Sequence, residues 1–117
     1  MPDCIFCKII NRKLPAKIEY EDEDILAFFD IKPAAKVHII IVPKKHIASV
    51  NELTEKDASI ISKMALVGKK LAKKHHTDIK GYKFVINTGL YSGQTILHLH
   101  MHLLGGEILA GRKILEI

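Results

Sequence analysis

Nine residues near the C-terminal end restrict the fold more than any other segment: Ile96-Leu-His-Leu-His-Met-His-Leu-Leu104. Side chains alternate between the two faces of a β-strand, so a strand here places His98, His100 and His102 on one face. The opposite face, which we expect to be the core face, carries Leu97, Leu99, Met101 and Leu103. One imidazole among apolar residues usually belongs to a packed core, but three in strict alternation indicate a chemical role.

The remainder of the chain predicts four more strands and two helices. Short apolar or β-branched runs bounded by turn residues indicate strands at residues 18–21, 25–29, 38–42 and 84–87. Thr54 is a good N-cap with acidic residues in the next turn, so we expect a long helix from there to about His75. Apolar residues at helical spacing indicate its core face: Ile60, Met64, Val67 and Leu71.

Residues 4–10 predict a short N-terminal helix, and no regular βαβ alternation is visible. The expected fold class is therefore α+β, with an antiparallel sheet of about five strands, one long helix and a short N-terminal helix. A chain of 117 residues is long enough for one domain, so we expect a single domain over residues 1–117.

Composition narrows the class of protein. No apolar run approaches the ~20 residues of a membrane-spanning helix. The first residues interleave charges with apolar side chains, unlike a signal peptide, which leads us to expect a cytoplasmic protein. The formal charge of +5 suits an anionic ligand such as a nucleotide. With few aromatic residues and no Trp, a stacking platform for nucleic acid is not expected.

Two kinds of chemistry fit the three histidines. A His-x-His pair on a strand can bind zinc through imidazole nitrogens. Alternatively, a neutral imidazole can attack phosphorus while neighbouring imidazoles exchange protons. The loop from Gly89 to Thr95 favours the second reading, because the glycines let backbone N–H groups approach phosphate oxygens. Gln94 and Thr95 are expected to add side-chain donors there.

The motif His98-Leu-His100-Met-His102-Leu-Leu resembles the His-φ-His-φ-His-φ-φ signature of the histidine triad (HIT) family, where φ is apolar. The similarity extends over most of the chain. It includes residues 5–10, 15–16, 27–31, 43–47 and 87–106. The chain looks most like the branch of nucleoside phosphoramidate hydrolases, also called histidine triad nucleotide-binding proteins.

The resemblance implies catalytic roles for three histidines. His100 matches the family nucleophile, which attacks the α-phosphate and forms a nucleotidyl-histidine intermediate that water hydrolyses. His102 and the loop donors would stabilise charge on the phosphoryl oxygens. His38 matches a histidine that aids protonation of the leaving group. Without the family, His38 could equally be a buried structural histidine.

The resemblance also implies a nucleotide site. Asp30 matches the carboxylate that accepts both ribose hydroxyls, and Asn87 matches a residue on the phosphate side. Gly93, Gln94 and Thr95 belong to the phosphate loop. The residues that align with the apolar purine slot are Ile5, Phe6, Ile9, Leu14, Phe28, Ile31 and Ile40. On the sequence alone, Asp30 would be read as a turn residue and the apolar residues as ordinary core.

The pair Cys4-Ile-Phe-Cys7 is a weak signal by itself, since it fits a redox pair, half a zinc site or coincidence. Some microbial HIT proteins bind zinc through such a pair together with the histidines that match His46 and His98. The resemblance therefore implies a structural zinc at Cys4, Cys7, His46 and His98, which would orient His100 from behind.

Three differences from relatives bear on specificity. The third triad position is His102, whereas the nucleotidyltransferase branch has glutamine, so hydrolysis is favoured over transfer. The residues after Gly106 lack the tryptophan that often ends relatives, and Tyr91 replaces a usually small residue. The resemblance therefore does not predict which leaving group the protein prefers.

The predicted reaction is cleavage of a purine nucleoside monophosphate from an amine, by a homodimer paired through the helix and adjoining strand. The alternatives are a dinucleoside polyphosphate hydrolase, a nucleotide-binding adaptor with incidental hydrolysis, and a zinc-dependent interaction module.

Overall fold

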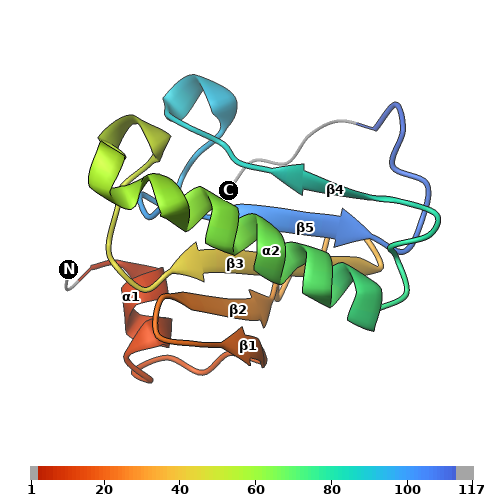
Figure 1. The fold of residues 1–117 in the computed structure, drawn as a ribbon, viewed down its shortest axis with the longest axis horizontal. Coiled ribbons are helices and arrows are strands. Elements are labelled where there is room, and N and C mark those ends of the chain that lie inside the picture. The colour runs from red at the N-terminus through yellow and green to blue at the C-terminus, as the bar shows by residue number, and fades with distance from the viewer. Residues whose placement is uncertain (1–2, 113–117) are drawn as a thin grey trace.

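The computed structural model describes residues 3–112 and contains a five-stranded antiparallel sheet in the order β1-β2-β3-β5-β4 (Figure 1). Its strands are β1 (Ile18–Glu21), β2 (Ile25–Phe29), β3 (Val37–Pro43), β4 (Tyr82–Val85) and β5 (Met101–Gly105). The α-helices are the short α1 (Ile5–Ile10) and the long α2 (Ala58–Lys74), and three 3-10 turns are η1 (Val50–Glu52), η2 (Glu55–Asp57) and η3 (Leu90–Ser92). The expected α+β fold class is confirmed.

The sheet separates two apolar clusters. Alternate residues of β3 point to opposite faces, so Ile39 and Ile41 pack beneath α2 while Ile40 and Val42 pack against α1. His102 pairs with Ile40 in the β3–β5 register. The third triad histidine therefore lies on the α1 face, and Leu103 faces α2.

The core face of α2 is as expected. Met64, Val67 and Leu71 are buried, and Ile60 packs partly buried against the same cluster. Gly68 brings the helix close to β4, because a Cβ there would lie 2.5 Å from Cε1 of Phe84. Among the described residues, no helix is long and apolar enough to span a membrane.

The helix start differs from expectation. Thr54 caps the 3-10 turn η2 instead of α2, which begins at Ala58, and its hydroxyl donates to Asp57 instead of accepting a backbone N–H. The two acidic residues after Thr54 therefore lie in η2.

The last strand is shorter than the alternation predicted. It begins at Met101 instead of Ile96, because its ladder partners end: β3 pairs no further than Ile41↔Met101, and β4 no further than Val85↔His102. The backbone before it turns towards another segment, where Leu99 N donates to Ile47 O at 2.6 Å. Leu97 was expected in the core, but its side chain is 63% exposed.

Strand β4 also differs from the predicted range of 84–87. It begins at Tyr82 and ends at Val85, so Asn87 lies beyond it.

Candidate active site

All three triad histidines are buried, with exposures of 1% or less. His100 Nδ1 lies 2.7 Å from the carbonyl oxygen of His98. A carbonyl oxygen can only accept a hydrogen bond, so Nδ1 of His100 must carry the proton. The other ring nitrogen of a neutral His100, Nε2, then holds the lone pair that a nucleophile requires.

His38 and His102 form a second hydrogen-bonded arrangement with a defined direction. The backbone N–H of Ala34 donates to His38 Nδ1 at 3.0 Å, which places the proton of a neutral His38 on Nε2. That nitrogen lies 2.9 Å from His102 Nδ1 and 3.5 Å from a carboxylate oxygen of Asp30. His102 Nδ1 therefore accepts, and the proton of a neutral His102 is on Nε2, a buried atom that has no hydrogen-bond partner among the described residues.

Burial keeps these rings neutral. It lowers the pKa of His102 to about 3, with a smaller contribution from the nearby rings of His100 and His38. Burial also lowers the pKa of His38, and the carboxylate of Asp30 opposes the shift. Since imidazolium is disfavoured, the site offers a neutral donor, His102 Nε2–H, beside the ring of His100, at 5.0 Å between ring centroids.

An apolar cavity of about 570 Å³ lies next to this cluster. All seven residues expected in the purine slot line it, namely Ile5, Phe6, Ile9, Leu14, Phe28, Ile31 and Ile40. Asp30 and His38 also line it, so the cavity reaches the histidines through His38. Phe6, which lines the cavity, also packs edge-to-face against His100, at 5.0 Å between ring centroids. The arrangement is an apolar slot with one carboxylate, that of Asp30, among its lining residues.

The loop before the triad is built differently from expectation. Gln94 is 4% exposed, and its side-chain amide donates to Ala48 O and Ile96 O while its carbonyl accepts from Gly89 N. Both amide hydrogens are therefore used inside the protein in this structure, so contact of the Gln94 side chain with phosphate stays a prediction. Gly93 needs its left-handed conformation, at φ +89°, to close η3.

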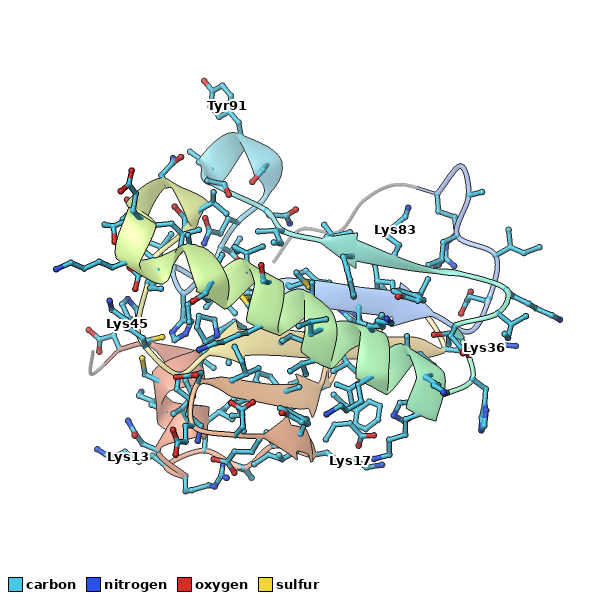
Figure 2. The ribbon with its side chains drawn as sticks, viewed as in Figure 1. Lys13, Lys17, Lys36, Lys45, Lys83 and Tyr91 are labelled. Carbon is cyan, nitrogen blue, oxygen red and sulfur yellow. The ribbon has the colours of Figure 1, made fainter. Side chains whose placement is uncertain are left out.

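The other predicted phosphate-side residues are dispersed. Asn87 is buried and is not among the residues lining the 570 Å³ cavity. Thr95 is exposed and lines a separate cavity of about 540 Å³ with Cys4 and His46. Tyr91 is fully exposed and points away from the body of the molecule, so it lines neither cavity (Figure 2).

The four predicted metal ligands converge. His98 Nδ1 lies 3.3 Å from Cys4 Sγ and 3.6 Å from Cys7 Sγ, and His46 Nδ1 lies 3.3 Å from Cys7 Sγ. Since His98 Nε2 donates to the carbonyl oxygen of Pro43 at 2.8 Å, its Nδ1 presents a lone pair to the sulfurs. Zinc bonds of about 2.3 Å to sulfur and 2.05 Å to nitrogen put tetrahedral S and N ligands about 3.6 Å apart. The four residues therefore fit zinc in both donor type and spacing.

Two contributors to the site were not predicted. Ala34 orients His38 through a backbone N–H, for which a side-chain pattern carries no signal. Ile96 was assigned to a strand, yet it lines the apolar cavity beside His38. Its apolar side chain is equally typical of a core strand. Only the structure shows that the β-ladder does not extend back to Ile96.

Comparisons with known proteins place the chain in a family. Residues 3–113 match the family model described as scavenger mRNA decapping enzyme C-term binding. A HIT-like protein of Buchnera aphidicola is 49% identical over 103 residues, which cover 88% of this chain and 90% of that protein.

Solved structures agree with this placement. A HIT family hydrolase from Clostridium thermocellum superposes with a TM-score of 0.92 at 48% identity, covering 98% of this chain and 99% of that one. A more distant match is a histidine triad nucleotide-binding protein from Candida albicans, with a TM-score of 0.73 at 32% identity, covering 86% of this chain and 73% of that one. The chain therefore belongs to the histidine triad (HIT) family of hydrolase-like proteins.

Proposed function

We propose that this protein hydrolyses purine nucleoside 5′-phosphoramidates through a nucleotidyl intermediate on His100. The observation that carries the proposal is the hydrogen bond from His100 Nδ1 to the carbonyl oxygen of His98. It leaves Nε2 of a neutral ring as the nucleophilic nitrogen, which is the protonation state needed to attack phosphorus.

In the proposed reaction, His100 Nε2 bonds to the α-phosphorus and the phosphorus–nitrogen bond to the amine breaks. The leaving nitrogen takes a proton from solvent water, and His102 Nε2–H donates a hydrogen bond that stabilises charge on the phosphoryl oxygens. Water then attacks the phosphorus, the bond between phosphorus and His100 Nε2 breaks, the water proton passes to solvent, and the nucleoside monophosphate leaves. His38 Nε2–H, at 2.9 Å from His102 Nδ1, keeps the proton of His102 on Nε2, from which it can donate.

The nucleoside is expected to occupy the cavity that Ile5, Phe28 and Ile40 help to line, because a flat purine matches an apolar slot. Asp30 also lines the cavity, so its carboxylate can accept hydrogen bonds from two ribose hydroxyls. The solved relative from Candida albicans is named as a nucleotide-binding protein, which is consistent with this assignment.

Zinc is part of the proposal. Cys4, Cys7, His46 and His98 would hold it, and its contribution would be structural, tying α1 and the turn after β3 to the triad segment. His98 would connect the metal to catalysis, because its ring faces the two sulfurs while its carbonyl oxygen accepts from His100.

The active form is proposed to be a homodimer. The outer edge of β4 lies at the end of the sheet without a neighbouring strand among the described residues, and Leu66 on α2 is 64% exposed. Open strand edges and exposed leucines are both typical of subunit contacts. Analytical ultracentrifugation of the wild type and Leu66→Glu would test this assembly.

The test of function is a hydrolysis panel of adenosine and guanosine phosphoramidates against dinucleoside polyphosphates. We expect the phosphoramidates to have the higher kcat/KM. Preferred cleavage of dinucleoside polyphosphates would assign the protein to the alternative hydrolase class. Nucleotide binding without turnover on either substrate would indicate an adaptor.

A further inference from the structure

The segment that follows β5 is hydrogen-bonded to the loop that joins β2 to β3. Glu107 accepts from the backbone N–H of Lys36 at 2.7 Å, and Arg112 donates to Glu107 at 2.7 Å. A second Arg112 nitrogen donates to the carbonyl oxygen of Ala34 at 2.7 Å. We call Glu107 and Arg112 the C-terminal latch. Figure 2 labels Lys36 at the end of the sheet where β5 finishes.

A glycine turn makes this contact possible. Gly106 has φ +83°, and a Cβ on it would lie 3.0 Å from Cβ of Lys36 and 3.3 Å from Cγ2 of Val37. A larger residue would be strained in this conformation and would push the two segments apart. Gly106 therefore lets Glu107 reach the loop immediately after the strand ends.

The loop held by the latch carries the donor that sets the histidine tautomers. Ala34 is bonded on both sides of its backbone: its carbonyl oxygen accepts from Arg112, and its N–H donates to His38 Nδ1. The beginning of the loop is held differently, because Lys32 N donates to a carboxylate oxygen of Asp30 at 2.7 Å. Hence the latch holds the part of the loop that faces His38, while Asp30 holds the part before it.

We infer that Glu107 and Arg112 are positioning residues for the hydrogen-bonded histidines His38 and His102. By holding Ala34, they keep the proton of His38 on Nε2, which makes His102 Nδ1 an acceptor and His102 Nε2 a donor. The inference rests on the proposed function for its catalytic consequence, but the tautomer of His38 is a property of the protein alone. Neither latch residue contacts the apolar cavity.

The latch is poorly suited to a purely structural role. The side chains of Arg112 and Glu107 are 45% and 32% exposed. Exposed ion pairs contribute little to folding stability, with a typical range of about 0–1 kcal/mol. Removal of the latch should consequently change the geometry of Ala34 more than it changes the melting temperature of the protein.

The experiment compares Arg112→Ala, Glu107→Ala and Arg112→Lys with wild type. The matched control is Lys63→Ala, which removes an exposed ion pair of the same length, 2.7 Å to Asp24, on α2. Nitrogen-15 NMR of histidine-labelled protein reports which ring nitrogen of His38 carries the proton. Turnover of an adenosine phosphoramidate and the melting temperature are measured on the same samples.

We expect the two alanine variants to shift the His38 nitrogens towards a tautomer mixture and to lower kcat about ten-fold, with a smaller change in KM. Arg112→Lys should be intermediate, since an ammonium lacks the fork that bonds Glu107 and Ala34 together. Lys63→Ala should match wild type in all measurements. Unchanged His38 signals in both alanine variants would overturn the inference. Absence of turnover in wild type would refute the proposed function, and the NMR comparison would still decide the role of the latch.

Discussion

The carbonyl oxygen of His98 lies 2.7 Å from Nδ1 of His100, while the ring of His98 faces the sulfurs of Cys4 and Cys7. One residue therefore belongs to two clusters, the candidate metal site through its side chain and the candidate nucleophile through its backbone. Any displacement of the His98 ring is expected to change the protonated nitrogen or the orientation of His100.

This link gives a prediction about the metal. Zinc should copurify at about one per chain, and the double variant Cys4→Ser with Cys7→Ser should lose it and melt at a lower temperature, because zinc would connect residues distant in sequence. Metal analysis and thermal unfolding provide the measurement. Turnover should fall less than in His100→Ala. If chelation abolished catalysis without changing the melting temperature, the site would have to be reassigned as catalytic.

The carboxylate of Asp30 should recognise ribose. Asp30→Ala is expected to weaken nucleoside monophosphate binding about ten-fold or more, because hydrogen bonds to a charged group contribute about 1.5–3 kcal/mol. Calorimetric titration with ribose and 2′,3′-dideoxyribose ligands measures the effect. The variant should distinguish the two ligands less well than wild type. Equal discrimination in both proteins would leave Asp30 a structural role, through its hydrogen bond to Lys32 N and its contact with His38.

Gln94 should act on the structure of the loop. Gln94→Ala removes three hydrogen bonds, to Gly89, Ala48 and Ile96, and is expected to cost about 1–3 kcal/mol of stability. Urea unfolding measures this cost. Ser92→Ala is the control, since Ser92 also bonds Gly89 but is exposed. A Gln94 variant as stable as the Ser92 variant would argue against this role.

The buried histidines should make folding depend on pH. Burial lowers the pKa of His102 to about 3, below the ~6.5 of an unfolded histidine. The unfolded chain therefore binds more protons below pH 6.5, and the free energy of unfolding falls as pH falls, by up to about 1.4 kcal/mol per pH unit for this group. The charged or titratable side chains around the ring are His100, His38 and, through His38, Asp30.

Urea unfolding between pH 7 and pH 5 tests this dependence, with His102→Asn as the comparison because asparagine does not titrate in this range. Wild type should lose stability more steeply than the variant. Equal slopes would mean that the environment of His102 does not disfavour its charged form.

The histidine alternation predicted that the three imidazoles lie close together but overstated the length of the strand. His98, His100 and His102 are all buried near one another, as expected, yet only His102 lies within β5. The alternation of side-chain types continues where the hydrogen-bonded ladder has already ended. A sequence pattern cannot show where the partner strands end. Leu97 was misplaced for the same reason.

Local patterns predicted the strands β1 and β2 and the core face of α2, because each depends on spacing or apolar character. The residues of the apolar cavity were expected from the resemblance to the family, since apolar character alone does not distinguish them from core. The tautomers could not be predicted. They depend on backbone atoms of Ala34, Pro43 and His98, which any residue type supplies.

The nucleophile is the central claim, and trapping the intermediate tests it most directly. Wild type and His100→Ala are mixed with an adenosine phosphoramidate, quenched within one turnover and examined by intact-mass spectrometry. We predict a mass increase of one nucleoside monophosphate less water on wild type alone, mapped to His100, while the variant binds nucleoside monophosphate but does not turn over. An adduct on the variant, or near-normal turnover by it, would contradict the account.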